Sequence, residues 1–218
     1  MHWEPDAGDE PESSSARRIG FAKRIGVLAL QGGFAAHARP LEELGHVTFE
    51  ARTARDVEKA EGLVLPGGES SAQLLLIERF GLEGSIRALV ASGRPLLATC
   101  AGTILVAADV TSPRQRSFAL IDIDVARNAY GRQRESFEAT ADGSEELPLV
   151  FIRAPRILRV GRAVEVLATL RSEPILVREG NVTAATFHPE LTGDTRVHRG
   201  VFGEARESVR LAASGTCI

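Results

Sequence analysis

The stretch Ile25-Gly26-Val27-Leu28-Ala29-Leu30, followed at once by Gln31-Gly32-Gly33, decides the fold. It carries no polar side chain before Gln31, which is typical of a strand buried on both faces of a parallel sheet. The two glycines end the strand, and residues 34–44 then predict a helix that stops at Gly45. The chain therefore opens its folded part with a strand–turn–helix unit.

The same alternation of strand and helix continues along the first half of the chain. Further strands are predicted at 47–49, 62–65 and 95–99, and helices at 70–80, 82–92 and 101–108. Strands that alternate with helices predict an α/β fold of three layers around a mainly parallel sheet. In the second half, strand-like runs are separated mostly by turns and predict antiparallel additions to the sheet: 118–126, 150–153, 164–170, 175–178 and 182–187. Residues 194–213 are expected to be helical in part.

Composition and length limit the domain organisation. The chain has 218 residues, of which 44% are hydrophobic, so one domain at 24–212 is expected. Residues 1–23 are acidic and rich in serine and have almost nothing to bury, which predicts a disordered extension. Residues 213–218 are expected to form a short tail.

Charge and cysteine content exclude several classes of protein. A net charge of -3 argues against a nucleic-acid partner. No window reaches the ~18 apolar residues of a membrane helix, and the N-terminus lacks the apolar core of a secretory signal. Cys100 and Cys217 cannot form a disulfide framework, and no pair has the spacing of zinc ligands. We therefore expect a cytoplasmic protein with reduced thiols, no bound metal and no cofactor.

Cys100 lies at a predicted junction between a strand and a helix, in Ala98-Thr99-Cys100-Ala101-Gly102. A sharp turn at this place lifts the side chain above the sheet edge, and the following helix N-terminus favours a thiolate. The alternative is a buried cysteine that packs as a small hydrophobic residue. The turn alone makes the two interpretations about equal.

His188 ends another strand-like run, in Thr186-Phe187-His188-Pro189-Glu190. A histidine there, with a carboxylate two residues later, suits a general base held by an acid, which a cysteine nucleophile requires. The remaining histidines are interpreted as structural or exposed: His2, His37, His46 and His198.

The segment Leu65-Pro66-Gly67-Gly68-Glu69-Ser70 follows a predicted buried strand. Paired glycines allow unusual backbone angles and expose N–H groups that can hold an oxyanion or a carboxylate. Ser70 is the expected cap of the next helix. A plain strand-to-helix turn is the alternative, and by itself this segment favours it.

The PGGES, TCAG and FHPE segments, in this order, resemble a class I (triad) glutamine amidotransferase with its flavodoxin-like fold. Leu30-Gln31-Gly32 with His37, the RNAYGRQ block at 127–133, Ser136-Phe137-Glu138 and the FIRAP block at 151–155 resemble one family more closely. This family is the glutaminase subunit of pyridoxal 5′-phosphate synthase (the Pdx2 or SNO type). The resemblance covers about residues 24–201.

The resemblance implies hydrolysis of L-glutamine and transfer of the ammonia to a synthase subunit of the Pdx1 or SNZ type, for vitamin B6 biosynthesis. It makes Cys100 the nucleophile, His188 the general base and acid, and Glu190 the residue that orients His188. The implied glutamine site is formed by Gly68, Glu69, Ser70, Arg127, Ile152 and Arg153. Backbone N–H groups of Gly68 and Ala101 would form the oxyanion hole. The family generally needs the synthase subunit for activity, so low activity in isolation is expected.

Two alternatives stay open at this point. One is a triad glutaminase that serves another acceptor, such as imidazole glycerol phosphate synthesis. The other is a non-catalytic subunit that binds and regulates a synthase, against which the intact set of Cys100, His188 and Glu190 argues. A repeated arginine at 153, 156, 159 and 162 is either a docking face or a consequence of arginine-rich composition, which we favour.

Overall fold

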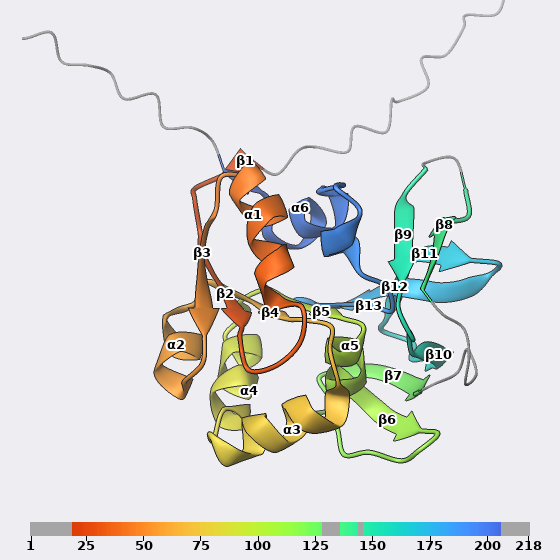
Figure 1. Ribbon diagram of the computed structural model, residues 1–218, viewed down its shortest axis with the longest axis horizontal. Coiled ribbons are helices and arrows are strands. Elements are labelled where there is room, and N and C mark those ends of the chain that lie inside the picture. The colour runs from red at the N-terminus through yellow and green to blue at the C-terminus, as the bar shows by residue number, and fades with distance from the viewer. Residues whose placement is uncertain (1–18, 128–135, 144–145, 206–218) are drawn as a thin grey trace, which may run out of the picture.

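A seven-stranded sheet forms the middle layer of the protein (Figure 1). The computed structural model describes residues 19–127, 136–143 and 146–205. Within this part of the chain the strands of the sheet lie in the following order: β11 (Glu165–Leu170), β12 (Glu173–Glu179), β13 (Val182–Ala185), β5 (Leu96–Thr99), β4 (Gly62–Leu65), β2 (Arg24–Leu28) and β3 (Val47–Ala51).

The strands from β13 to β3 are all parallel to their neighbours, and β12 and β11 are antiparallel additions at one edge. Taken in chain order, the parallel strands have the arrangement 2-1-3-4-5, which is that of flavodoxin-like folds. The expectation that 182–187 is an antiparallel addition was wrong, because β13 pairs in parallel with β5. A tight turn at Gly180 and Asn181 reverses the chain after β12, so β13 returns in the direction of β5.

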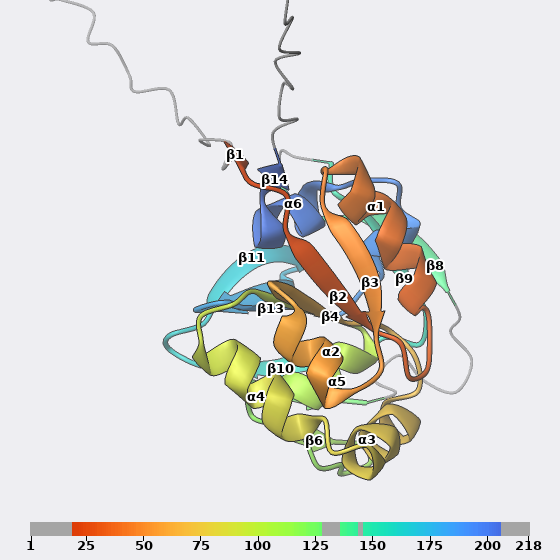
Figure 2. The ribbon, with the colours of Figure 1, turned by 90° about the vertical axis from the view of Figure 1, so that its left-hand side faces the viewer.

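Helices cover both faces of the sheet, so the buried strands alternate between two cores (Figure 2). Leu63 and Leu65 of β4 belong to the first core, whereas Val64 belongs to the second. This arrangement explains why the first predicted strand has no polar alternation. One face carries α2 (Ala54–Lys59), α3 (Ser70–Arg79), α4 (Glu83–Ala91) and α5 (Ala101–Val106); the other carries α1 (Ala38–Glu43) and α6 (Arg196–Phe202).

Most of the expected helices and strands are present, but several begin or end at residues other than those predicted. The helix predicted at 34–44 begins as a 3-10 turn, η1 (Phe34–His37), before α1. The helix predicted at 101–108 stops at Val106, because the chain continues as β6 (Ala107–Thr111), which pairs with β7 (Ile121–Ala126). Helix α2 was not predicted; Thr53 and Asp56 form its capping box.

Two small sheets stand beside the carboxyl end of the parallel strands (Figure 1). Strand β10 (Arg156–Val160) pairs with β7, and β8 (Phe137–Thr140) pairs with β9 (Pro148–Phe151). The His188 N–H donates to the Val150 carbonyl at 2.8 Å, which ties the β8–β9 sheet to the main one. This link brings the loop after β9 over the end of β5.

The described part of the expected N-terminal extension is not wholly without structure. Strand β1 (Ile19–Gly20) pairs in parallel with β14 (Glu204–Ala205), and the Lys23 ammonium donates to the Phe202 carbonyl at 2.7 Å. Backbone pairing at Ile19 and Gly20 therefore supplies order that apolar burial does not. Residues 1–18 and 206–218, with Cys217 and the expected tail, lie outside the described residues.

None of the helices in the described ranges is long and apolar enough to cross a membrane.

Candidate active site

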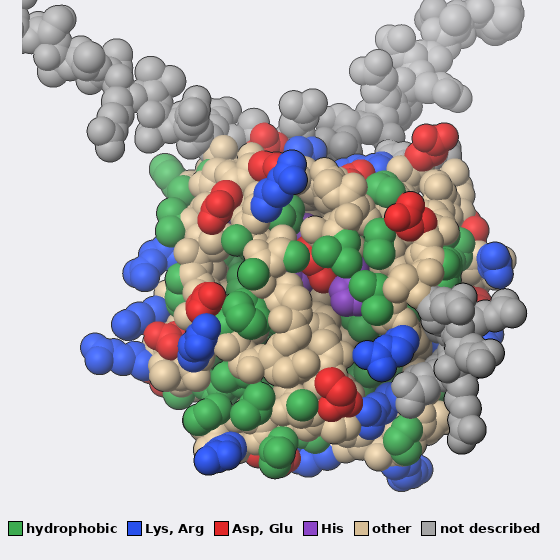
Figure 3. All heavy atoms as spheres, viewed as in Figure 1, with side chains coloured by type: hydrophobic (Ala, Val, Ile, Leu, Met, Phe, Trp, Pro, Cys, Tyr) green, Lys and Arg blue, Asp and Glu red, His purple; other side chains and the backbone are tan. Residues whose placement is uncertain are grey.

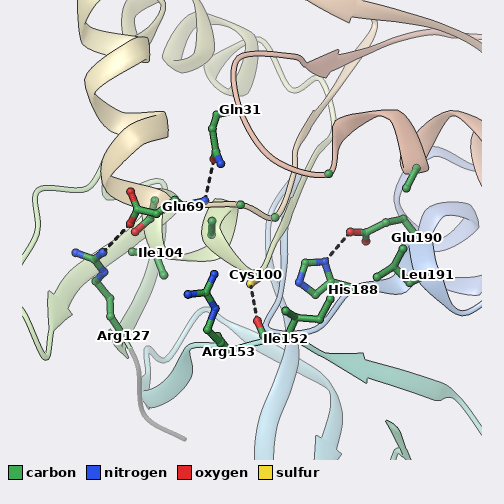
Figure 4. A pocket seen from close by; sticks show the side chains of 16 residues that line it. Gln31, Glu69, Cys100, Ile104, Arg127, Ile152, Arg153, His188, Glu190 and Leu191 are labelled. Atoms are coloured by element: carbon green, nitrogen blue, oxygen red, sulfur yellow. Dashed lines mark hydrogen bonds and ion pairs between the residues drawn. The ribbon is translucent and has the colours of Figure 1, made fainter. Parts of the chain in front are cut away.

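Loops that follow β2, β4, β5 and β13 meet at the carboxyl end of the sheet and line a cavity of about 340 Å³ (Figure 4). Open α/β sheets bind their ligands at this edge. In the space-filling view, histidine atoms reach the surface near the middle of one face, flanked by hydrophobic side chains (Figure 3). The cavity brings together every residue for which the sequence predicted a role: Gly68, Glu69, Ser70, Cys100, Ala101, Arg127, Ile152, Arg153, His188 and Glu190.

Cys100 occupies a strained turn between β5 and α5. Its φ of 48° and ψ of -102° lie outside the regions that L-residues usually adopt, a strain of about 1–3 kcal/mol. Backbone anchors hold the turn, because the Cys100 N–H donates to the Ala185 carbonyl at 2.8 Å and the Thr103 hydroxyl donates to the same oxygen at 2.6 Å. The thiol donates to the Ile152 carbonyl, with 3.7 Å between sulfur and oxygen. Strand β13 thus fixes the nucleophile candidate.

His188 and Glu190 form a close pair beside Cys100. The imidazole Nδ1 lies 2.7 Å from Glu190 Oε1, and the other ring nitrogen faces the Cys100 sulfur (Figure 4). Burial lowers the pKa of His188, but contact with Cys100 and Glu190 outweighs it and raises the pKa to about 10. The ring is therefore protonated at neutral pH and can give a proton to a leaving group.

Gly67 fills the narrow space against the imidazole and the thiol. A Cβ atom at this position would lie 2.3 Å from His188 Cε1 and 3.3 Å from Cys100 Cβ. No side chain fits there without displacing one of the two reacting groups. This requirement, and not the φ angle, accounts for the first glycine of the loop.

We expect Gly67→Ala to lower kcat of the reaction at this cavity by about 100-fold or more, because a shift of about 1 Å in reacting groups has effects of that size. Steady-state kinetics of the hydrolysis that the sequence leads us to expect would measure it. Gly84→Ala is a matched control for the substitution itself, since a Cβ at Gly84 meets nothing within 4 Å and its backbone is not in the left-handed region. Wild-type kcat in a folded Gly67→Ala variant would contradict the expected crowding.

The loop after β4 also caps α3, but through a residue different from the expected one. Glu69 is the N-cap, and its carboxylate accepts from the Ser71 and Ala72 N–H groups at 3.2 and 2.7 Å. Ser70 is the first helical residue, and its hydroxyl donates to Gln115 Oε1 at 3.0 Å. The expected cap at Ser70 was wrong because Glu69, one residue earlier, reaches the free N–H groups of the first turn.

Arg127 pairs with Glu69 at one side of the cavity (Figure 4). Its Nη2 atom lies 3.2 Å from Glu69 Oε1 and donates to Ser71 Oγ at 2.9 Å. The rest of the predicted block, at 128–133, lies outside the described residues. Arg153 lines the cavity from the loop after β9, with a φ of 44° that turns the chain sharply.

Sequence reasoning missed the residues that hold the glycine loop. Gln31 Oε1 accepts from the Glu69 N–H at 2.8 Å, and Gln73 donates to the carbonyls of Gln31 and Pro66 at 2.9 and 3.1 Å. The Gly33 N–H donates to the Gly67 carbonyl at 3.0 Å. Gln31 was available as a signal, since it follows the first parallel strand at the edge where the site forms.

Two members of the arginine series pair with acidic side chains of the same molecule. Arg156 pairs with Glu173, and Arg159 pairs with Asp122 and Asp124. Arg153 is in the cavity instead. These pairings favour the compositional interpretation of the repeat.

An elbow cysteine, a histidine–glutamate pair and a flavodoxin-like sheet together define a glutamine amidotransferase of the class I type. A solved structure described as "Crystal structure of glutamine amidotransferase" agrees, with a TM-score of 0.76 and 44% identity over 81% of this chain and 96% of that one. The SNO glutamine amidotransferase family matches residues 27–206, and the chain belongs to this family.

Two curated relatives from different organisms carry the same name. The "Pyridoxal 5'-phosphate synthase subunit PdxT" of Koribacter versatilis is 52% identical over 178 residues, which cover 80% of this chain and 92% of the relative. The protein of the same name from Frankia alni is 48% identical over 182 residues, which cover 81% of this chain and 92% of the relative.

Proposed function

We propose that this protein is the glutaminase subunit of a pyridoxal 5′-phosphate synthase, which hydrolyses L-glutamine to L-glutamate and ammonia. The observation that carries the proposal is the convergence of Cys100, His188 and Glu190 on one cavity at the end of the parallel strands. Names of the relatives at 52% and 48% identity support the choice of acceptor over other triad glutaminases.

In the proposed first step, the Cys100 sulfur attacks the carboxamide carbon of glutamine. The C–N bond breaks as His188 gives its proton to the departing ammonia, and a glutamyl thioester remains on Cys100. A water molecule then attacks the thioester carbon, with neutral His188 as its base, and glutamate leaves as the thiol is restored. Glu190 keeps the His188 Nδ1–H pointed away from the sulfur throughout, through the 2.7 Å contact.

The oxyanion formed in each step needs preorganised donors. We assign this role to the N–H groups of Gly68 and Ala101, which both line the cavity next to Cys100. One such donor typically contributes about 3–4 kcal/mol to the transition state.

Arg127 and Glu69 suit the two charged ends of a free amino acid. The Arg127 guanidinium can bind the α-carboxylate with two parallel N–H groups, while the Glu69 carboxylate can meet the α-ammonium. Gly68, Ser70, Ile152 and Arg153 complete the proposed glutamine site around the cavity. Its volume of about 340 Å³ falls at the low end of small-molecule pockets, as expected for one amino acid.

The proposed partner is the synthase subunit of the complex, which receives the ammonia, and the proposed location is the cytoplasm. We expect the isolated protein to release little ammonia from glutamine and to release much more with its cognate synthase subunit. Closure of a loop is a common way to complete a catalytic site, and we infer that the synthase subunit acts on the Gly67–Gly68 segment in this way.

A coupled glutamate assay with and without the synthase subunit tests this expectation. A synthase from imidazole glycerol phosphate synthesis serves as the comparison partner. Equal rates with and without the cognate synthase would refute the dependence on the partner. Stimulation only by the comparison partner would refute the assigned acceptor, and failure of Cys100 to react with a glutamine-analogue electrophile in the complex would favour a non-catalytic subunit.

A further inference from the structure

Two fully buried histidines lie behind Glu190, on the side opposite His188. His37 ends η1 and His198 belongs to α6, and both have 0% exposure. His37 Nδ1 lies 3.0 Å from His198 Nε2, with the rings at 61° to one another. A buried pair of imidazoles this close shares one proton between the facing nitrogens.

The far nitrogen of His37 is directed at the catalytic carboxylate. His37 Nε2 lies 3.5 Å from Glu190 Oε2 and 3.4 Å from the Thr99 hydroxyl. Glu190 Oε1 contacts His188 Nδ1. Among the described residues, no donor lies within hydrogen-bond distance of the other carboxylate oxygen, Oε2. The Glu190 side chain is only 1% exposed, so bulk solvent does not reach this oxygen. A buried carboxylate oxygen without a donor is costly, and the His37 N–H is the group placed to supply one.

Only one arrangement of protons suits all these contacts. If His37 carries its proton on Nε2, it presents an N–H to Glu190 Oε2, and its bare Nδ1 accepts from His198 Nε2–H. His198 Nδ1, which is buried without a partner in the described chain, is then a lone pair. The opposite tautomer would bury an unpaired N–H on His198 and point a lone pair of His37 at a carboxylate.

We propose that His37, held by His198, is a positioning residue that fixes Glu190 in its ionised form and aims it at His188. The proposal rests on the proposed glutaminase function, because Glu190 acts on the substrate only through His188. The described chain thus carries a line of polar contacts from Cys100 through His188, Glu190 and His37 to His198.

Electrostatics agree with this geometry. Burial raises the pKa of Glu190, but His37 and then His188 lower it below its ordinary value. Burial lowers the pKa of His37, and that of His198 falls to about 3, so His198 is neutral at physiological pH. The charged or titratable groups that face His37 are Glu190 and His188 from the segment after β13 and His198 from α6.

The test compares His37→Phe, which keeps the ring volume but removes both nitrogens, with His37→Gln, whose amide N–H still reaches Glu190. His46→Phe is the matched control, because His46 is 4% exposed and hydrogen-bonds to Lys23 and Gly203 away from the site. Each variant is assayed for glutaminase activity with the synthase subunit present, and its folding is checked by thermal unfolding.

For His37→Phe we expect kcat to fall by about 10- to 100-fold with little change in KM, since residues that orient a catalytic group commonly have effects of this size. The acid limb of the pH profile should move to higher pH, because a carboxylate that loses a donor has a higher pKa. His37→Gln should recover most of kcat, and His46→Phe should keep the wild-type kcat and pH profile.

Nitrogen NMR of the labelled histidines supplies a readout without turnover, and the proton is expected on His37 Nε2. A proton on His37 Nδ1, or a folded His37→Phe variant with wild-type kcat and acid limb, would overturn the proposal. If His37→Phe does not fold, His198→Phe replaces it as the test variant. We expect a smaller fall in kcat for His198→Phe, and wild-type kinetics in this variant would overturn the proposal. Absence of turnover in the wild-type complex would instead refute the proposed function itself.

Discussion

Replacing Cys100 with serine is expected to reduce ammonia release from glutamine by at least about 10⁴-fold in the presence of the synthase subunit, as loss of a triad nucleophile does elsewhere. Serine keeps the shape of the side chain, but its hydroxyl is a far weaker nucleophile than a thiolate. The strained φ of 48° is unchanged by the substitution, so folding should be preserved.

Steady-state release of glutamate, followed with the complex assembled, would measure this loss. Cys217→Ser is the control, because it removes the other cysteine of the chain and should leave turnover unchanged. Normal turnover by Cys100→Ser would refute the assignment of Cys100 as nucleophile and, with it, the thioester mechanism.

Replacing Glu190 with glutamine is expected to lower kcat by about 10³- to 10⁴-fold, the size seen when a triad carboxylate becomes an amide. The amide can present its N–H₂ group to His188, so a neutral His188 then carries its proton on the nitrogen that faces Cys100 and cannot take a proton from the attacking water. The substitution also removes the negative charge that helps to raise the pKa of His188 to about 10. Imidazolium at the site should therefore become less stable, and the pKa of His188 should fall.

A pH profile of kcat and a nitrogen NMR titration of His188 would check both parts of this expectation. Glu50→Gln is a suitable control, since Glu50 is exposed and pairs with Arg52 on the far part of the sheet. In the wild type the pKa of Glu190 lies below the ordinary pKa of glutamate. The Glu190 carboxylate therefore stays ionised when the pH equals that ordinary value, and it is protonated only as the pH falls further. Unchanged kcat in Glu190→Gln would contradict the orienting role.

Strand ends alone account for several residues that the sequence analysis expected to lie near one another. Gly67, Cys100 and His188 each follow a parallel strand, and parallel strands deliver their carboxyl ends to one edge of the sheet. The direction of β13 was not predictable from its own residues, because pairing with β5 depends on where the preceding hairpin turns. The cap at Glu69 also escaped prediction, since two adjacent polar residues can both begin a helix.

The histidines behind Glu190 show a different limit. His37 and His198 are 161 residues apart in sequence, and each looks unremarkable in its own segment. Their contact arises because α1 and α6 pack on the same face of the sheet and bring η1 toward the chain after β13. No local pattern reports such a contact, so their association with the triad had to come from the three-dimensional structure.

The anchoring of Cys100 to β13 has a consequence for the timing of biosynthesis. The Ala185 carbonyl holds both the Cys100 N–H and the Thr103 hydroxyl, and His188 lies only three residues further on. A growing polypeptide that has reached Cys100 contains neither the anchor nor the base. Because chains are made from the N-terminus, the nucleophile is assembled only after the last parallel strand has been synthesised and inserted beside β5. A nascent chain that ends before β13 therefore holds Cys100 without its backbone anchor and without His188.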